Sequence, residues 1–313
     1  MSANLASPIY HDEEAARKHL EGLRWPHGVA CPFCQKNEGV RALGGKSMGD
    51  GWYHCRVCRK KFTVRVGSVF ERSHIPLHKW LLAFRLMAGS KKGFSAHQLH
   101  RSLGVTYKTA WFMEHRIREA MTESDPRPLG GEGKTVEVDE TFIGPQGWEL
   151  HDNGWQRKRG TGDKAKVVSL VERGGRVRSV KVETIRVADI RKTVLTHLSI
   201  DTNLVTDEAH HYRHVGRLYA SHETVNHSKH EYGRGHVYTN TVEGFFSIFK
   251  RGMTGIYQHC SEKHLQRYLN EFDFRYSNRI ALGTNDASRT DAALIGAIGK
   301  RLYYRQPHGI RSL

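Results

Sequence analysis

Two aspartates stand at matching places in the sequence, each after a short run rich in β-branched and apolar residues. Asp139 follows Val-Glu-Val, and Asp207 follows Leu-Val-Thr. Because carboxylates at the ends of neighbouring strands meet at one edge of an α/β sheet, we expect these two side chains to lie together. Glu140 and Glu208 come next in the chain, and we expect them to face away or to support the site from behind.

A third acid comes from a predicted helix over residues 239–250. Glu243 and Lys250 are seven residues apart, and Asn240 precedes Glu243 by one turn, so the three share a helix face. Carboxylate oxygens suit Mg²⁺ or Mn²⁺, and two such ions can activate a water or sugar hydroxyl and stabilise the leaving oxygen of a phosphodiester. Lys250 would then contact a phosphate. Each residue alone has an ordinary alternative role, as a turn residue, a first-turn helix acid or a solvated charge.

Four cysteines form two Cys-x-x-Cys pairs with twenty residues between the pairs, namely Cys31, Cys34, Cys55 and Cys58. This spacing is typical of a structural zinc site in a zinc ribbon. The alternatives are disulfides or free core thiols. Disulfides are disfavoured, because no secretory signal is present and only one other cysteine exists. We therefore predict one structural zinc ion and a packed or free thiol at Cys260.

The chain of 313 residues carries a net charge of +17 and a sequence pI near 9.8. The basic excess is denser in residues 1–130, which hold 21 Lys and Arg against 11 Asp and Glu. Beside the cysteine pairs, such a balance favours a polyanionic partner through counterion release, and we expect a nucleic acid. The alternative is a generic soluble basic protein. The helix-turn-helix pattern of the next segment indicates that the nucleic acid is double-stranded DNA. No apolar run approaches the roughly 18 residues that a membrane span needs, and no signal peptide is recognised, so we expect a soluble, cytoplasmic protein with no membrane partner.

The first part of the chain is expected to bind DNA. Arg59 and Lys60 make the second cysteine pair basic, and a helix is predicted over 76–89. Helices over 95–102 and 106–121, separated by a turn at Gly104, have the pattern of a helix-turn-helix. Tyr107, Lys108, Thr109 and His115 would lie on or near the exposed face of its second helix. The alternative is an ordinary pair of packed helices.

The pattern changes to strands after a linker at 122–133. We predict a strand at 135–139 that extends past Asp139, a hairpin over 166–183, a helix at 187–198, a strand at 203–207 and helices at 239–250 and 261–277. This order predicts a mixed α/β domain. Residues 144–166 read as a loop whose basic residues Arg157, Lys158 and Arg159 would hold DNA backbone. A histidine-rich stretch over 210–236 fits no compact set of metal ligands.

The sequence predicts an organisation in five parts. They are an N-terminal helix (1–28), a zinc ribbon (29–66), a helical helix-turn-helix region (67–125), an α/β catalytic domain (130–280) and a C-terminal tail (281–313) to which no mechanism is assigned.

Several motifs together resemble bacterial insertion-sequence transposases of the ISXO2-like type. They are Cys-Pro-x-Cys with Tyr-His-Cys-x-x-Cys-x-x-x-Phe-Thr-Val, Val-Asp-Glu-Thr-Phe-Ile-Gly, Thr-Asp-Glu, and His-Val-Tyr-Thr-Asn-Thr-Val-Glu-Gly-Phe-Phe-Ser-Ile-Phe-Lys-Arg-Gly. The resemblance covers roughly residues 13–280. It implies a ribonuclease-H-like mixed sheet with flanking helices, a DDE-type triad and two Mg²⁺ or Mn²⁺ ions.

The same resemblance implies cleavage at the terminal inverted repeats of an element and joining of the 3′-hydroxyl to target DNA. Asp139 matches the first catalytic aspartate and Asp207 the second. The third residue is Glu243 or Asn240, and the spacing to Lys250 favours Glu243. Because two DNA ends must be paired, a homodimer or higher oligomer is expected. The competing functions are a metal-dependent nuclease without strand transfer and a DNA-binding zinc-ribbon regulator with an inert α/β domain.

Overall fold

A computed structural model describes residues 5–45, 48–144, 148–157, 160–226, 228 and 233–302. The chain divides into two compact units, and we describe each by itself. Unit 1 comprises Met1–Ser90, Phe94–Thr122 and Asn285–Leu313, and unit 2 comprises Lys91–Gly93 and Glu123–Thr284. Among the described residues, no helix is both long enough and apolar enough to cross a membrane.

Unit 1 contains a small antiparallel sheet formed by β1 (Val40–Leu43), β2 (Trp52–Cys55) and β3 (Lys61–Phe62), in that order. Its strands are too short to enclose a large apolar core. Three aromatic rings pack against one another instead, with ring centroids 5.5 to 6.0 Å apart, namely Trp25, Tyr53 and Phe62. The sheet carries the second cysteine pair at the end of β2, which agrees with the predicted zinc ribbon.

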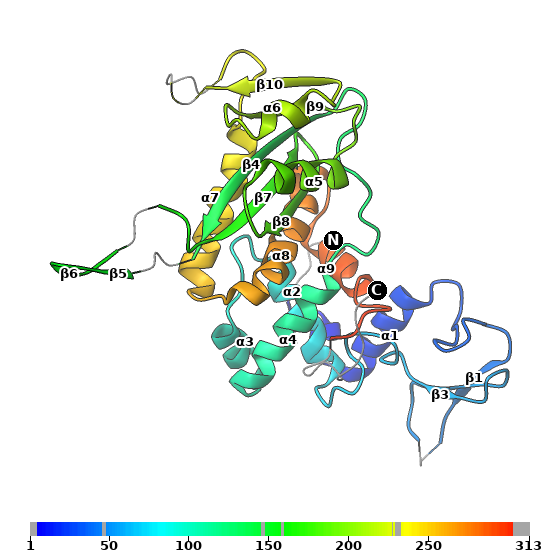
Figure 1. The fold of residues 1–313 in the computed structure, drawn as a ribbon. Helices are drawn as coiled ribbons and strands as arrows, with labels where there is room; N and C mark the ends of the chain where they lie inside the picture. Colours follow the sequence, from blue (N-terminus) through cyan, green and yellow to red (C-terminus); the bar gives the residue numbers. More distant parts are fainter. Residues whose placement is uncertain are drawn as a thin grey trace. The chain divides into compact units, whose positions relative to one another are not determined.

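Helices α1 (Glu13–Arg24), α2 (Leu77–Gly89), α3 (Ala96–Leu103) and α4 (Tyr107–Ala120) complete the N-terminal part of unit 1 (Figure 1). Helix α3 begins with a capping box between Ser95 and Gln98 and ends at Gly104, whose φ of 59° is left-handed. The Thr106 hydroxyl then accepts a hydrogen bond from Thr109 N–H and starts α4. Local capping chemistry therefore sets the two predicted helices and their turn.

One residue of α4 differs from the sequence prediction. His115 was expected near the exposed face, but only 1% of it is accessible, and its ring lies 4.2 Å from that of Trp111. Tyr107 and Lys108 are exposed as expected. His115 was misjudged because the buried side of α4 includes polar residues as well as apolar ones. Arg118, one turn after His115, is completely buried, so His115 shares a covered side of the helix.

The chain returns to unit 1 after residue 284. Helix α9 (Asp286–Ile295) lies in the segment predicted as a tail, and it is tied to the N-terminal helices. Arg85 Nη1 donates to Asp286 Oδ2 at 3.1 Å, and His19 Nε2 lies 2.9 Å from Asp291 Oδ1. These pairs join residues about 200 or more positions apart, which explains why local sequence patterns did not reveal them.

Unit 2 is built on a five-stranded mixed sheet in the order β10-β9-β4-β7-β8, which confirms the mixed α/β prediction. Strands β4 (Thr135–Ile143), β7 (Ala165–Glu172) and β8 (Val177–Val182) pair with one another in antiparallel fashion. Strands β9 (Asn203–Asp207) and β10 (Ser221–Val225) extend the sheet beyond β4 in parallel pairings. The central position of β4 gives it partners of both kinds.

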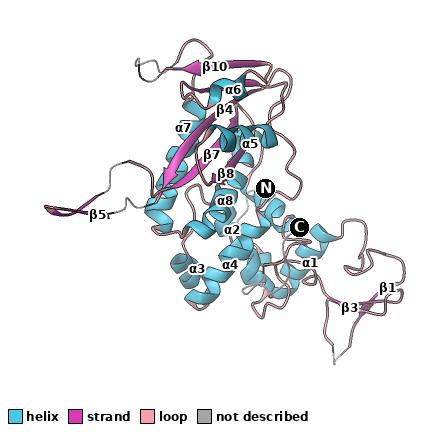
Figure 2. Ribbon diagram, in the orientation of Figure 1, coloured by secondary structure: helices cyan, strands magenta, loops and turns pink. Residues whose placement is uncertain are grey.

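Helices cover both faces of this sheet (Figures 1 and 2). Helices α5 (Val187–His197) and α6 (Tyr212–Gly216) share a core with Val136, Val138 and Leu204. On the opposite face, α7 (Asn240–Gly252) and α8 (Leu265–Ser277) pack on Val167 and Val171. The strands therefore alternate between two apolar cores. Short one-turn elements complete the described chain, namely η1 (Pro8–Tyr10), η3 (Met253–Tyr257), η4 (Glu262–His264) and η5 (Ile280–Leu282).

The segment between β4 and β7 was predicted as a loop, and this was wrong. It contains an antiparallel hairpin of β5 (Trp148–His151) and β6 (Gly154–Arg157), which the view in Figure 1 shows projecting from the sheet. The predicted DNA contacts Lys158 and Arg159 lie outside the described residues, and Arg157 is the last residue of β6. Gly154 supplies a φ of 101° at the tip, where the strands turn back.

Asp273 on α8 is partly buried and joins that helix to the sheet. Its two oxygens accept hydrogen bonds from Ser179 N–H at 2.6 Å and from Ser179 Oγ at 2.7 Å. Burial raises the pKa of Asp273 to about 7, although the hydrogen bonds from Ser179 oppose this. Because the folded state favours the protonated carboxyl, its contribution to stability is greatest below the unfolded pKa and is lost as the pH rises through about 7.

Asp273→Asn should flatten this pH dependence. The amide keeps an acceptor for Ser179 N–H and does not ionise, so the fall in melting temperature between about pH 4 and pH 7 should be smaller than in the wild type. Thermal unfolding followed by circular dichroism at several pH values measures the slope. Glu183→Gln is a suitable control because the Glu183 side chain is 85% exposed. Equal slopes in the wild type and Asp273→Asn would contradict the assignment.

Candidate active site and zinc centre

Strand register places the two predicted aspartates side by side. Strands β4 and β9 are parallel, with Thr135 opposite Asn203 and Glu137 opposite Val205. Continuing this register by two residues puts Asp139 level with Asp207. Asp139 comes two residues after Glu137, and Asp207 comes two residues after Val205. Because side chains alternate along a strand, both aspartates project from the same face of the sheet as that pair. The sequence predicted this proximity, and the register provides it.

The reason for the proximity differs in one respect from the prediction. Asp207 ends β9 as expected, but Asp139 lies in the middle of β4, which continues to Ile143. The pairing between β4 and β9 ends at Glu137, whereas β4 remains paired with β7 through Ile143. Asp139 therefore stands just beyond the last β4 residue that pairs with β9, at the edge of the parallel part of the sheet.

Helix α7 brings the third acid to the same face. Its buried side packs Val242, Phe245 and Phe249 against the sheet, and its exposed side carries Asn240, Glu243 and Lys250. Glu243 lies close enough to Asp139 for its charge to raise the pKa of that aspartate. Lys250 is two turns further along the exposed side, as predicted, with its Nζ 5.9 Å from the centre of the Phe246 ring.

The environment of Asp139 disfavours its negative charge. Burial raises the pKa of Asp139 to about 7, and the charges of Glu140, Asp207 and Glu243 act in the same direction. The N–H of Glu140 donates to Asp139 Oδ1 at 2.7 Å and opposes this rise. Burial also raises the pKa of Asp207, although Ala209 N–H donates to it at 3.0 Å. Among the described residues, neither aspartate forms an ion pair with Lys or Arg.

Glu140 projects to the other face of the sheet, as the alternation of β4 requires. Its carboxylate lies 3.0 Å from His211 Nε2 and accepts a hydrogen bond from the Tyr212 hydroxyl at 2.5 Å. Burial would raise the pKa of Glu140, but these two partners together lower it. Glu140 in turn raises the pKa of His211, against the effect of burial. The sequence analysis did not assign His211 and Tyr212 to this site.

The donor set suits a divalent cation. Carboxylate oxygens are hard ligands, and two partly buried aspartates with raised pKa values gain most from a cation that replaces their protons. In the described conformation the three carboxylates are less closely gathered than the cysteines, whose four donor atoms all lie within 4.8 Å of one another. Asp139, Asp207 and Glu243 are therefore the residues that could hold such an ion, with Asn240 as a further oxygen donor.

The four cysteines form a compact set suited to tetrahedral coordination. Cys31 Sγ lies 3.5 Å from Cys58 Sγ, and Cys34 Sγ lies 3.7 Å from Cys55 Sγ. Zinc bound tetrahedrally at about 2.3 Å from each sulfur requires sulfur atoms roughly 3.8 Å apart. The backbone amide of Cys58 contributes most to lowering the pKa of the Cys55 thiol to about 7, which favours the thiolate that zinc binds. The arrangement fits a structural zinc ion.

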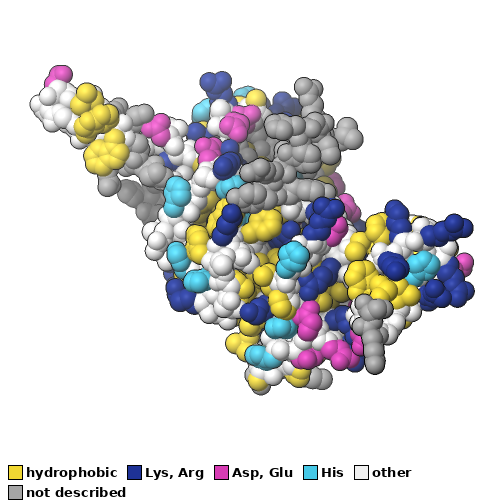
Figure 3. Space-filling view, turned by 90° about the horizontal axis from the view of Figure 1, so that it is seen from below, with side chains coloured by type: hydrophobic (Ala, Val, Ile, Leu, Met, Phe, Trp, Pro, Cys, Tyr) yellow, Lys and Arg dark blue, Asp and Glu magenta, His cyan; other side chains and the backbone are white. Residues whose placement is uncertain are grey.

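The remaining predicted DNA contacts are exposed in unit 1. Arg59 adopts a φ of 58° in the turn after the second cysteine pair, and Lys60 Nζ lies 4.5 Å from the centre of the Phe33 ring. Figure 3 shows Lys and Arg side chains gathered over the zinc ribbon. At the start of α4, the ring of Tyr107 stacks on His97 with centroids 4.4 Å apart.

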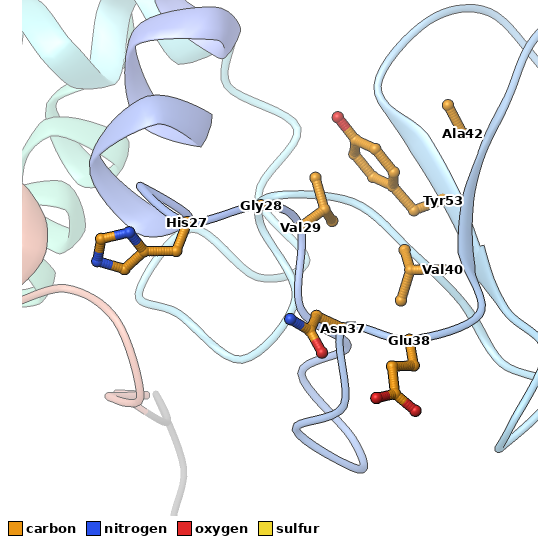
Figure 4. Close-up of a pocket in the computed structure, with 8 residues that line it drawn as sticks. All are labelled: His27, Gly28, Val29, Asn37, Glu38, Val40, Ala42 and Tyr53. Atoms are coloured by element: carbon orange, nitrogen blue, oxygen red, sulfur yellow. The ribbon is translucent and has the colours of Figure 1, made fainter.

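A groove of about 480 Å³ lies on the zinc ribbon (Figure 4). It is lined by His27, Gly28, Val29, Asn37, Glu38, Val40, Ala42 and Tyr53. None of the predicted catalytic, zinc-binding or DNA-binding residues lines it. Its one carboxylate, on Glu38, makes it a poor site for phosphate.

Comparisons with known proteins match two parts of the chain to family models. Residues 128–277 match the ISXO2-like transposase domain, and residues 11–61 match the transposase zinc-ribbon domain. An uncharacterized protein in transposable element ISH50 of Halobacterium salinarum is 29% identical over 274 residues, which are 84% of this chain and 90% of that protein. The Mos1 transposase paired-end complex with left transposon end aligns over 65% of this chain and 77% of its own, at 10% identity and a TM-score of 0.22, too slight a likeness to describe the fold.

Cys55→Ser should remove stoichiometric zinc and destabilise the ribbon. One of four thiolates is lost, and the short strands around it have little apolar core to replace the metal. Zinc content by elemental analysis and thermal unfolding measure the two effects. Cys260→Ser is the matched control, because Cys260 lies outside the four-cysteine cluster and should keep full zinc content. Equal zinc content in both variants would contradict the assignment.

Asp139→Asn should stabilise the protein at pH 8 when no divalent cation is added. Because its folded-state pKa is raised to about 7, ionised Asp139 lowers stability as the pH rises through that value, and the amide avoids this loss. The variant avoids the charge repulsion and the cost of burying a charge. Its melting temperature should exceed that of the wild type by roughly 2–4 °C for each kcal/mol gained in the free energy of unfolding. The difference should shrink at pH 5. A melting temperature at pH 8 lower for the variant than for the wild type would contradict the conclusion that ionised Asp139 destabilises the fold.

Proposed function

Because the chain belongs to the ISXO2-like transposases, we propose that it is a DDE-type polynucleotidyl transferase. It cleaves DNA at the terminal inverted repeats of an insertion sequence and joins the freed 3′-hydroxyl to target DNA. The observation that carries this proposal is the parallel register that sets Asp139 level with Asp207, on the sheet face where α7 presents Glu243. A nucleic-acid partner also agrees with the net charge of +17.

The proposed fold of unit 2 is ribonuclease-H-like. Three features support it: an antiparallel run of β4, β7 and β8, two further strands added in parallel beside β4, and helices on both faces. In this arrangement the first acid comes from the central strand, the second from the neighbouring parallel strand, and the third from a later helix. Asp139, Asp207 and Glu243 occupy those three positions.

Each acid has a separate role in this proposal. Asp139, Asp207 and Glu243 would hold two Mg²⁺ or Mn²⁺ ions, with Asp139 contributing to both sites and Asp207 and Glu243 to one site each. When bound, the ions supply activation of a water or 3′-hydroxyl and stabilisation of the leaving oxygen. Because the pKa of Asp139 is raised to about 7, binding of a cation there would be coupled to loss of the Asp139 proton. Glu243 is preferred over Asn240 because its charge acts on Asp139.

The remaining contacts hold the DNA. In this proposal Lys250 binds a phosphate, and its exposure two turns after Glu243 on the same helix side supports the role. Arg59 and Lys60 on the zinc ribbon and Tyr107 and Lys108 at the start of α4 bind the element's ends, with α4 as the recognition helix of a helix-turn-helix. Arg157, Lys158 and Arg159 bind backbone in this proposal. Pairing of two DNA ends requires a homodimer or higher oligomer. The protein acts in the cytoplasm, which holds the bacterial chromosome.

A strand-transfer assay tests the proposal. Purified protein, Mg²⁺ or Mn²⁺, a labelled duplex of the element's end and a supercoiled plasmid are combined. Metal-dependent cleavage and joining are expected, with losses of about 10³-fold or more in Asp139→Asn and Glu243→Gln, because each removes a metal ligand. Asn240→Ala should lose much less. Glu183→Gln, an exposed acid in unit 2, is the control.

The outcomes separate the competing functions. Cleavage without joining, even with a pre-cut end, would identify a nuclease. DNA binding with neither reaction, unchanged by Asp139→Asn, would identify a DNA-binding regulator with an inert α/β domain. A large loss in Asn240→Ala with normal activity in Glu243→Gln would make Asn240 the third ligand.

A further inference from the structure

Glu137 is a fully buried acid that the proposed chemistry does not use. It precedes Asp139 by two positions on β4 and therefore lies on the same face of the sheet, toward α7. Its side chain has 0% exposure, and its neighbours in sequence, Val136 and Val138, belong to the core on the opposite face. A charged side chain is held at such a depth only when its oxygens are fully hydrogen-bonded and its charge is paired.

Both oxygens of Glu137 meet the first turn of α7. Oε2 accepts hydrogen bonds from the backbone N–H of Thr241 at 2.8 Å and of Val242 at 2.9 Å. Oε1 accepts from the Thr241 hydroxyl at 2.7 Å. Two N–H groups that the helix leaves without internal partners are therefore bound by an acid from a strand more than 100 residues earlier. The negative charge also suits the positive end of the helix dipole.

Helix α7 makes no cap of this kind for itself. Thr239, its N-cap residue, is of a type that normally accepts hydrogen bonds from the first-turn amides, but it forms no such cap. Its hydroxyl donates to Glu243 Oε1 at 2.9 Å instead. Glu137 takes the capping role, and Thr239 orients the acid proposed as the third metal ligand.

Arg173 closes the arrangement from the other side. Its Nε donates to Glu137 Oε1 at 2.6 Å, while Nη1 and Nη2 donate to the backbone carbonyls of His236 and Tyr238 at 2.6 and 2.7 Å. Its guanidinium also lies 3.7 Å from the centre of the Tyr238 ring. The planar guanidinium thus holds the chain that leads into α7 against the same acid that holds the helix.

We propose that the Glu137–Arg173 pair is a positioning device that sets the distance between Asp139 and Glu243. The inference rests on the proposed function, since it concerns how two of its metal ligands are brought together. Glu137 and Asp139 share one rigid strand, and Glu137 binds the helix turn that carries Glu243. Any shift of α7 along or away from β4 breaks the Glu137 hydrogen bonds and moves Glu243 relative to Asp139. Glu137 and Arg173 touch no reacting atom and are not catalytic residues.

Position 137 requires glutamate because both the charge and the length of the side chain matter. Glutamine keeps the shape but turns an N–H₂ group toward the amides of α7 or toward Arg173, all of which are donors. Aspartate keeps the charge, but its shorter side chain cannot reach α7 unless the helix moves toward β4. A displacement near 1 Å at a catalytic group can lower a rate about 100-fold.

The test compares Glu137→Gln and Glu137→Asp with Asp273→Asn. Asp273 is the matched control, because it is also an acid that joins a helix to the sheet through backbone and hydroxyl donors, but its helix is α8 and it is only partly buried. Four quantities are measured on the zinc-loaded full chain: amide hydrogen exchange of α7, affinity for Mn²⁺ by electron paramagnetic resonance, affinity for the end duplex by electrophoretic mobility shift, and strand transfer.

Both Glu137 variants should increase exchange in the first turn of α7 and weaken Mn²⁺ binding about 10- to 100-fold, with a similar or larger loss of strand transfer. Glu137→Asp guards against misfolding, since it retains the charge beside Arg173. DNA binding should remain within about twofold of the wild type. Asp273→Asn should leave α7 exchange and Mn²⁺ affinity unchanged.

Faster exchange with unchanged Mn²⁺ affinity and strand transfer would overturn the proposal, leaving Glu137 as a helix cap only. Equal losses of Mn²⁺ affinity in Asp273→Asn would also overturn it, because the effect would then be general destabilisation. If the wild type neither cleaves nor joins DNA, the proposed function fails separately. The positioning role is then judged by Mn²⁺ affinity and exchange alone, and it fails if the Glu137 variants match the wild type.

Discussion

The two-residue period of strand β4 is the constraint on which the arrangement of unit 2 depends. Val136, Val138 and Glu140 project to the face covered by α5 and α6, whereas Glu137 and Asp139 project to the face covered by α7 and α8. Because the strand is central, each face must be filled. A shift of register by one residue would send Asp139 into an apolar core and Val138 to the site. The parallel pairing with β9 then places Asp207 at the same level.

Several acidic residues lie close together on β4 and β9, and they fall into two groups by their partners. Glu137 is paired with Arg173, and Glu140 with His211, so these two carry charges that are compensated within the fold. Asp139 and Asp207 have raised pKa values and no Lys or Arg partner among the described residues. The fold thus uses basic side chains to hold the supporting acids and leaves the two aspartates available to a cation.

The two units owe their stability to different interactions. The sheet of unit 2 lies between two cores of Val, Leu and Phe side chains, and burial of apolar area holds α5 to α8 in place. The ribbon of unit 1 has strands of two to four residues and a cluster of three aromatic rings. Zinc bound by the four cysteines would supply the stability that so small a core lacks. The helices of unit 1 are further held by long-range ion pairs from α9.

The sequence alone was sufficient for the features set by local chemistry. Cysteine spacing identified the zinc ribbon, and the helix-turn-helix pattern around Gly104 located α3 and α4. Short apolar, β-branched runs followed by acids located β4, β9 and their aspartates. It could not show that Glu137 caps α7, that His211 and Tyr212 hold Glu140, or that the last helix returns to unit 1. It also misjudged His115 and the β5–β6 hairpin. Most of these features join residues that are distant in the chain, and only the tertiary structure brings such groups together. The burial of His115 depends on which side of α4 packs against the rest of unit 1, which is also a property of the tertiary structure.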